Sequence, residues 1–327
     1  MPSLTSPARA PRPARGARRG GPVGDAALPA PGSAAPVRRR GRTVFRYAFA
    51  LPSILLVLLF FAIPFIANGL FAFTRWTGYS SVITWDGLSN FRLLQQLGVL
   101  SHATEVTAIY AVTSMLVQNV VGLALALAMQ RTTRGNSVFR SLFFIPVLIS
   151  PLAAGYIWSA ALATNGPVNA VISVFVPGGF HYAWLGHNLS ALICVACVDA
   201  WKWTGLVTLV YIAGLNRIPE RISEAALLDG AGPWRRLRSV TFPLLAPALT
   251  FNVVITLVGA FSALDVVFST TGGGPGDATA VLNVALYNEY GQSFFGMASS
   301  LGFVITLLVV LTAVPLITWL RRREVQM

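Results

Sequence analysis

The sequence EAALLDGAGPWRRLRSVTFPLLAP, residues 224–247, interrupts a chain that otherwise consists largely of apolar runs. The stretch carries charges and two glycines, and it lies between two long apolar segments. A charged helix of about eleven residues is too short to cross a bilayer. We therefore expect a short helix at a membrane surface, followed by a turn and a basic cluster, and the rest of the chain indicates which surface this is.

The composition is typical of a membrane protein. The chain has 327 residues, of which 55% are hydrophobic and 11% are charged, whereas soluble domains carry about 25% charged residues. The net charge is +13, and Lys202 is the one basic residue that is not an arginine. This composition predicts an all-α polytopic membrane protein.

Six apolar segments are long enough to cross a bilayer, which takes about 20 residues. The first begins after a basic stretch that suggests a signal peptide, but its apolar region is too long and no small-residue cleavage site follows it. Several prolines, among them Pro52, Pro64, Pro146 and Pro151, lie inside predicted spans, where neighbouring helices can satisfy the freed carbonyl groups. The predicted spans cover residues 45–73, 105–130, 139–163, 188–214, 247–270 and 295–320.

The arginines predict the orientation. Outside the N-terminal region they gather in two interhelical segments and at the end of the chain, at Arg131, Arg134, Arg140, Arg217, Arg221, Arg235, Arg236, Arg238, Arg321, Arg322 and Arg323. The segments 164–187 and 271–294 contain no Lys or Arg, and segment 74–104 has only Arg75 and Arg92. Because cytoplasmic loops are enriched in Lys and Arg, we expect both termini and the 215–246 insert to be cytoplasmic.

The two ends of the chain differ from the spans. Residues 1–43 are rich in Arg, Pro and Ala and lack apolar periodicity, so we expect a disordered cytoplasmic tail. Residues 44–320 are then the six-span transmembrane domain, and 321–327 form a short cytoplasmic tail. The basic tail lacks the aromatic residues and folded scaffold of a nucleic-acid site, which favours a role in topology or in contact with membrane lipid.

The insert 215–246 has clear helix signals. Pro219 fits a first helical turn, Gly230 supplies the left-handed residue that ends a helix, and Pro233 marks a new start. One face of the helix combines Ile222, Ala225, Ala226 and Asp229 at helical spacing. Composition alone also fits an amphipathic helix that rests on lipid headgroups.

The detailed pattern of the insert resembles the EAA signature of binding-protein-dependent ABC importer permeases. That signature is EAA, three residues, Gly, nine residues and Ile-x-Leu-Pro. Here Glu224-Ala225-Ala226 precedes Gly230, and Val240-Thr241-Phe242-Pro243 follows, with Val for Ile and Phe for Leu. The resemblance implies a coupling helix that docks a separate ATPase through Glu224, Ala225, Ala226, Asp229 and Gly230.

Three more segments resemble the carbohydrate permeases of the maltose/glycerol-3-phosphate type: WDGLSNFRLL (85–94), RGNSVFRSLFFIPVLISP (134–151) and FSALDVVFSTTGGGPGDATAVL (261–282). The resemblance covers residues 45–320. It implies a bacterial cell-membrane importer of a sugar or sugar-like polyol. It also implies a homologous second permease, two ATPase subunits and an extracytoplasmic substrate-binding protein as partners.

Polar and aromatic residues inside the spans are candidates for the solute path. Asp199 and Lys202 share a face of the fourth span and fit either a structural ion pair or a functional site. Trp201 and Trp203 fit either packing on sugar rings or core packing. Asp265 is expected to be a second buried carboxylate, able to bind hydroxyl groups or to pair with Lys202. Asn119 fits an interhelical hydrogen bond better.

The sequence shows no set of catalytic residues. Cys194 and Cys197 lie in an apolar run, and His102, His181 and His187 lack metal-ligand spacing, so we expect no metal site. TGGGPGDAT (271–279) lacks the GK[ST] of a phosphate-binding loop, and we interpret it as a turn near the outer mouth. We expect no cofactor in this chain, with ATP-Mg bound by a partner. The alternative is an ion-coupled secondary transporter, which would leave the insert unexplained.

Overall fold

The computed structural model describes residues 50–130 and 133–322. The predicted N-terminal tail, Arg131 and most of the predicted C-terminal tail lie outside these residues. The chain divides into two units, Met1–Leu56 and Val57–Met327. In the first unit the described residues 50–56 are helical. The regular structure of the second unit is helical, and its described residues contain one isolated β-bridge, between Thr74 and Trp85.

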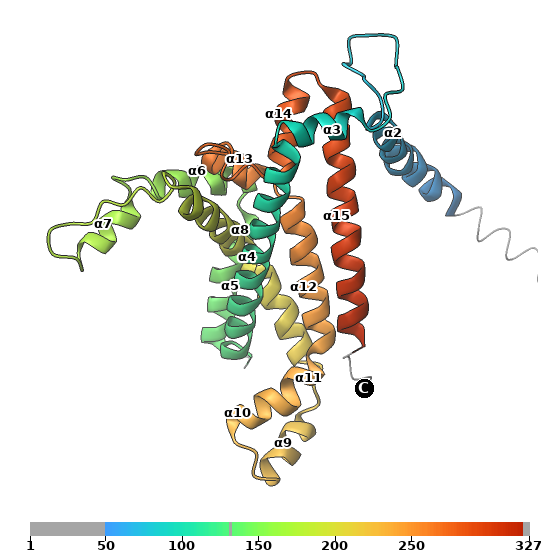
Figure 1. The fold of residues 1–327 in the computed structure, drawn as a ribbon. Helices are drawn as coiled ribbons and strands as arrows, with labels where there is room; N and C mark the ends of the chain where they lie inside the picture. Colours follow the sequence, from blue (N-terminus) through green and yellow to red (C-terminus); the bar gives the residue numbers. More distant parts are fainter. Residues whose placement is uncertain (1–49, 131–132, 323–327) are drawn as a thin grey trace, which may run out of the picture. The chain divides into compact units, whose positions relative to one another are not determined.

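Helices of very different lengths follow one another along the second unit (Figure 1). Their bounds are η1 Leu58–Ala62, α2 Ile63–Phe71, α3 Ser89–Gln96, α4 Val99–Ala128, α5 Arg134–Leu148, α6 Pro151–Ala161, α7 Pro167–Ser173, α8 Asn188–Leu215, α9 Glu220–Leu228, α10 Pro233–Arg236, η2 Leu237–Thr241, α11 Phe242–Leu244, α12 Ala246–Phe261, α13 Asp265–Thr271, α14 Leu282–Gly291 and α15 Phe295–Arg321.

Four helices are individually long and apolar enough to cross a membrane: Ala50–Phe71, Val99–Ala128, Asn188–Leu215 and Phe295–Arg321. Two sharply bent pairs raise the number of candidate spans to six if each pair counts as one span. The predicted class, an all-α polytopic membrane protein, is therefore confirmed. The third and the fifth predicted spans are not single helices in the structure.

The third span is broken where α5 meets α6, with a bend of 99°. Pro151 has no N–H to offer the carbonyl of Val147, one turn earlier. The buried Lys202 Nζ donates to that carbonyl instead, at 3.3 Å. The Ser150 side chain then caps α6 by accepting from the Ala153 N–H at 3.1 Å. The predicted continuous helix 139–163 is therefore two helices.

The fifth span is shorter than predicted, because α12 ends at Phe261 and α13 begins at Asp265. The side chain of Asn283 donates from Nδ2 to the carbonyl of Phe261 at 2.9 Å and so satisfies one of the carbonyls freed at the helix end. The region before α12 is also bent, by 69° between Pro233–Leu244 and Ala246–Phe261. The predicted single helix over 247–270 is therefore wrong.

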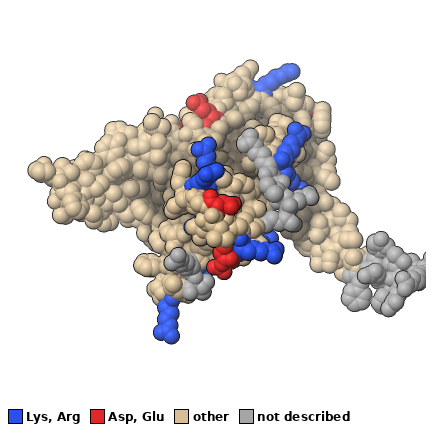
Figure 2. All heavy atoms as spheres, turned by 90° about the horizontal axis from the view of Figure 1, so that it is seen from below, with Lys and Arg blue, Asp and Glu red and all other residues tan. Residues whose placement is uncertain are grey.

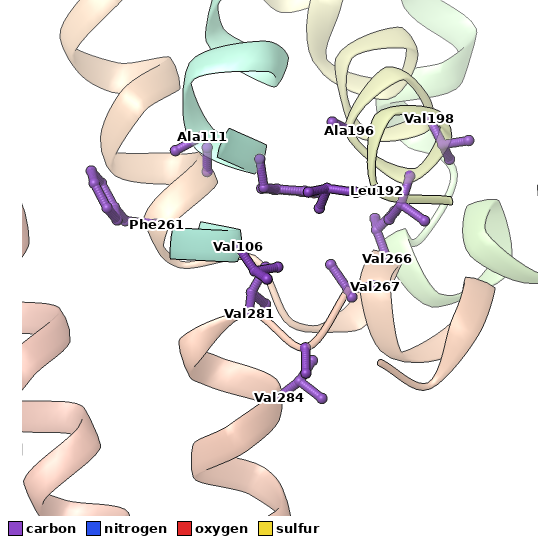
Figure 3. Close-up of a cluster of buried hydrophobic side chains, with 14 of the residues drawn as sticks. Val106, Ala111, Leu192, Ala196, Val198, Phe261, Val266, Val267, Val281 and Val284 are labelled. Carbon is purple, nitrogen blue, oxygen red and sulfur yellow. The ribbon is translucent and has the colours of Figure 1, made fainter. Parts of the chain in front are cut away.

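The core of the second unit forms where α4, α8 and α12 pack together and where α13 and α14 begin. Figure 3 shows side chains of this buried cluster, among them Val106, Leu192, Phe261 and Val281. Small residues allow close helix packing: a Cβ added at Gly122 would lie 2.7 Å from Val207. Among the four unbroken candidate spans, α8 is the most buried, and it carries four of the candidates for the solute path.

Candidate coupling segment and solute path

The segment between α8 and α12 contains α9, which begins after Pro219 and ends at Leu228. Pro219 is the N-cap and does not lie in the first turn. Gly230 has φ +73°, as predicted for the residue that ends this helix. The N–H of Gly230 donates to Leu227 O at 3.0 Å and the N–H of Ala231 to Ala226 O at 2.9 Å. These two bonds form a Schellman motif, which fixes the angle of the turn.

The surface of α9 is uncovered in this chain. None of its residues is buried, and Glu224, Ala225 and Asp229 are exposed. Leu228 is 90% exposed and Trp234, in α10, is 73% exposed. Figure 1 shows α9 and α10 beyond the ends of the long helices of the second unit. Apolar side chains this exposed on a protruding segment are typical of a surface that contacts another protein.

Basic side chains surround this end of the unit. Figure 2 looks at it from the side of α9 and α10 and shows several blue Lys and Arg side chains beside a few red acidic ones. The exposed arginines of the segment and of the end of α15 include Arg217, Arg221, Arg235, Arg238, Arg321 and Arg322. The acidic residues of the segment are Glu220, Glu224 and Asp229.

A cavity of about 400 Å³ lies between α8 and α12, with Gln118 of α4 at its wall. Its lining is almost entirely apolar apart from a few polar groups, and such a combination is typical of ligand sites. Three lining residues, Leu206, Phe251 and Ile255, are exposed, so the cavity opens at the surface of this chain. The lining also includes Asp199, Trp203, Val207, Val210, Asn252, Thr256, Gly259 and Ala260.

Asp199 lies at one end of this cavity, and its side chain is almost completely buried. The Ser114 hydroxyl donates to its carboxylate at 2.7 Å, and the Gln118 amide donates to the same oxygen at 3.4 Å. The buried Tyr110 hydroxyl lies close to Asp199 but in a geometry that falls short of a hydrogen bond. The carboxylate is therefore held by uncharged donors from α4.

Lys202 does not form the direct ion pair with Asp199 that the sequence suggested as one possibility. Within residues 50–130 and 133–322 the structure contains no salt bridge between the two. The ammonium group of Lys202 lies 4.0 Å from the centroid of the Trp203 ring and donates to the Val147 carbonyl. Lys202 therefore stabilises the break between α5 and α6, and it does not line the central cavity.

A second polar network crosses α4, α8 and α12 beside the cavity. The Tyr211 hydroxyl donates to Asn119 Oδ1 at 2.6 Å, and Asn119 Nδ2 donates to the Thr256 hydroxyl at 3.0 Å. Asn252 is fully buried, and its Nδ2 donates to the Val207 carbonyl at 3.1 Å. Among the residues that the structure describes, none forms a hydrogen bond with Asn252 Oδ1. A buried, unpaired acceptor in a cavity wall is suited to a donor from a bound molecule.

The structure separates the six candidates for the solute path. Asp199 and Trp203 line the cavity, and Asn119 contacts it through Thr256. Trp201 instead packs edge-on against Trp158 of α6, with ring centroids 5.4 Å apart.

The expectation that Asp265 is a buried carboxylate is wrong, because the residue is exposed in this chain in the first turn of α13. The helix that was expected to bury it has already ended at Phe261. The described residues show no ion pair between Asp265 and Lys202.

Two polar residues of the cavity, Asn252 and Thr256, were not predicted. They lie four residues apart in the fifth span, and this spacing was the available signal.

The glycine-rich segment 271–279 forms a firm turn. The Thr279 side chain is fully buried, and its hydroxyl lies 2.7 Å from that of Thr271 and donates to Gly274 O at 2.9 Å. Gly272, Gly273 and Gly276 have positive φ angles. In the part of the chain that the structure describes, no group of three His, Cys, Asp or Glu side chains is placed to hold a metal ion.

Comparison with known proteins identifies the family. Residues 118–324 match the family model of the "binding-protein-dependent transport system inner membrane component". The match covers more than half of the chain, and the chain therefore belongs to this family. It is an inner membrane transport component with several membrane-spanning helices. Membership agrees with the expectation of a transport subunit that relies on a separate ATPase and has no enzymatic activity or cofactor of its own.

Individual relatives cover most of the chain. The probable starch degradation products transport system permease protein AmyD of Thermoanaerobacterium thermosulfurigenes is 30% identical over 87% of this chain and 96% of its own length. The trehalose/maltose transport system permease protein MalF of Thermococcus litoralis is 29% identical over 80% of this chain and 89% of its own length. The sn-glycerol-3-phosphate transport system permease protein UgpA of Rhizobium meliloti is 32% identical over 75% of this chain and 84% of its own length.

The fold also resembles solved importer structures. A chain of a bacterial ABC transporter involved in the import of the acidic polysaccharide alginate superimposes with a TM-score of 0.73 at 21% sequence identity. The superposition covers 86% of this chain and 96% of the other. The two chains therefore share the same helical fold.

Proposed function

We propose that this chain is the permease subunit through which an ABC importer moves a sugar or sugar-like solute across the cytoplasmic membrane. Family membership supports the transport role. The solute class is supported by relatives whose names refer to starch degradation products, trehalose/maltose and sn-glycerol-3-phosphate. The solute binds and leaves without covalent chemistry.

In this proposal α9 is the coupling helix, and its geometry is the observation that carries the docking role. The helix is short, uncovered and ended by a rigid turn at Gly230. On one side a four-residue link joins it to α8, and on the other the chain passes through α10, η2 and α11 into α12; α8 and α12 are the helices that line the central cavity. A rigid-body movement of a docked ATPase would therefore reach both walls of the cavity through the backbone.

The proposed partners are two ATPase subunits, a homologous second permease and an extracytoplasmic substrate-binding protein. The second permease is supported by the central cavity, which one chain leaves open along Leu206, Phe251 and Ile255. A facing subunit would close this side and complete an enclosed path. Closing the path matters because a polar solute is poorly tolerated in contact with lipid.

The proposed path runs along Asp199, Trp203 and the Asn119 network. Asn252 Oδ1 would accept a hydrogen bond from a hydroxyl group of the solute. The Trp203 ring would pack against a sugar ring. Asp199 would shape the end of the site, because its carboxylate already accepts two hydrogen bonds. Lys202, Trp201 and Asp265 lie outside the lining of the cavity and are weaker candidates for contact.

The proposed orientation places both termini and α9 in the cytoplasm. The exposed arginines of the α9–α10 segment support it, together with Arg321 and Arg322 at the end of α15. Figure 1 shows these two regions at the same end of the second unit. The turn 271–279 then lies on the outer side, where a substrate-binding protein delivers the solute.

The first test is purification of the tagged chain in mild detergent, with identification of the proteins that accompany it. We expect a second six-span chain and an ATPase, and we expect reconstituted vesicles to take up a sugar only when ATP is supplied. Glu224→Lys reverses a charge on the exposed face of α9 and should abolish recovery of the ATPase. Glu105→Lys, also exposed but on α4 outside the insert, is the control. Normal ATPase recovery with Glu224→Lys would contradict the docking role.

A further inference from the structure

A second cavity continues the central one along the same groove. It has a volume of about 350 Å³ and lies toward the α9 end of α8 and α12. Its walls are Val210, Ala213, Gly214, Arg217, Leu244, Leu245, Pro247, Ala248 and Phe251. Val210 and Phe251 are the residues that line both cavities. The two cavities therefore meet at this pair.

The register of the two helices puts the pair between the cavities. On α8, Val210 follows Leu206 and precedes Ala213 at helical spacing, and on α12 Phe251 lies between Ala248 and Ile255. Asp199 and Arg217 stand at the two ends of the groove. The helical part of this stretch, from Asp199 to Leu215, is about 24 Å long at 1.5 Å per residue, which is most of the thickness of a hydrocarbon core. The groove thus covers most of a membrane crossing.

Leu206 and Ile255 lie one turn from the pair in the central cavity, and small residues lie on the inner side and farther along the central one. Ala213, Gly214 and Ala248 lie on one side, and Gly259 and Ala260 on the other. At the bottom of the groove α8 and α12 are in close contact, because a Cβ added at Gly214 would lie 2.7 Å from the Ala248 side chain. The Phe251 ring is 53% exposed on the open side of the groove. The groove is thus narrowed by a ring and not by the backbone.

We infer that Phe251, together with Val210, forms the constriction that separates the central site from an inner exit cavity ending at Arg217. This inference rests on the proposed function and assigns a position in the path. The inner cavity is lined by residues at both ends of the coupling segment: Arg217 just after α8, and Leu244 and Leu245 just before α12. Movement of α9 therefore changes the width of the exit directly, and Phe251 determines whether the two cavities join.

Single cysteines on either side of the constriction test this inference. Ala213→Cys reports on the inner cavity and Gly259→Cys on the central one, where an added Cβ meets no atom within 4 Å. Both are made after Cys194 and Cys197 are replaced by alanine, in the full complex. A charged methanethiosulfonate that does not cross membranes is added without nucleotide to inside-out vesicles, which expose the cytoplasmic side.

We expect fast modification at Ala213→Cys and slow modification at Gly259→Cys. Adding Phe251→Ala should accelerate the Gly259→Cys reaction roughly tenfold, equivalent to lowering the entry barrier by about 1.4 kcal/mol, and leave Ala213→Cys unchanged. Phe139→Ala is the matched control, because Phe139 is equally exposed but lies on α5 outside both cavities. Val210→Ala is the second variant if Phe251→Ala fails to assemble with the ATPase.

Equal rates at both cysteines in the parent complex would overturn the inference, because the constriction would then be open. The inference would also be overturned if neither Phe251→Ala nor Val210→Ala changed the modification rate of Gly259→Cys. This outcome includes the case in which a lipid chain fills the inner cavity. ATP-dependent sugar uptake by the parent complex is measured in parallel in right-side-out vesicles that contain ATP. Loss of uptake with an intact rate difference would contradict the proposed function and leave the constriction standing.

Discussion

Asp199 illustrates what a charge inside a predicted span signifies at the scale of one residue. Its position in the fourth span marked it as a candidate, because charged side chains there are costly and are retained for a reason. The structure adds that Ser114 and Gln118 hold the carboxylate. These partners come from another helix, and sequence spacing cannot identify them. The side chain therefore joins α4 to α8 as well as lining the cavity.

Replacement of Asp199 should distinguish hydrogen bonding from charge. Asp199→Ala leaves the Ser114 and Gln118 donors without their acceptor and should cost about 1–3 kcal/mol of stability. Asp199→Asn keeps an acceptor oxygen and should cost less. The thermal unfolding midpoint of the purified complex measures both. Equal losses for the two variants would show that the charge matters and the hydrogen bonds do not.

Lys202 gives a second residue-scale prediction. Lys202→Met keeps the apolar stem but removes the donor to the Val147 carbonyl and the contact with the Trp203 ring. We expect a loss of about 1 kcal/mol that is confined to the junction of α5 and α6. Hydrogen exchange of residues 147–153 should become faster, while that of α15 should not change. Unchanged exchange at the junction would mean that the lysine is not needed to hold the break.

At the scale of the element, hydropathy predicted where apolar helices occur but not where they break. The segments 188–214 and 295–320 correspond closely to α8 and α15, because each is a continuous apolar run. The third and fifth spans are equally apolar, yet they break where tertiary partners satisfy the freed carbonyls: Lys202 for one and Asn283 for the other. Hydropathy measures transfer into lipid and contains no information about such partners.

The same reasoning explains which parts of the cavity the sequence missed. Trp203 and Asp199 were recognisable because aromatic and charged residues are unusual deep in a span. Asn252 and Thr256 are less conspicuous, because uncharged polar side chains often bond to their own helix, as Thr256 does to the Asn252 carbonyl at 2.7 Å. Only the packing of α12 on α4 and α8 shows that they face a cavity.

The turn after α9 supports a prediction for the coupling segment. Gly230→Val places a β-branched residue at φ +73°, a conformation that such residues avoid, at a cost of roughly 1–2 kcal/mol. The Schellman turn should loosen, and the amount of ATPase recovered with the chain should fall. Gly232→Ala is the matched control, since Gly232 has φ −63° and open space around its Cα. Equal recovery for both variants would mean that the turn geometry is not required.

At the scale of the whole molecule, charge and apolar pattern together lead to a prediction of orientation. The arginine-rich α9–α10 segment should face the cytoplasm, and the loop between α2 and α3 should face outward. Leu228→Cys and Ser81→Cys, both at exposed positions, are compared in the cysteine-free chain. In intact cells an impermeant thiol reagent should label Ser81→Cys and spare Leu228→Cys, and in inside-out vesicles the pattern should reverse. Labelling of Leu228→Cys in intact cells would place α9 outside, where no ATPase could reach it, and would contradict the orientation and the coupling role together.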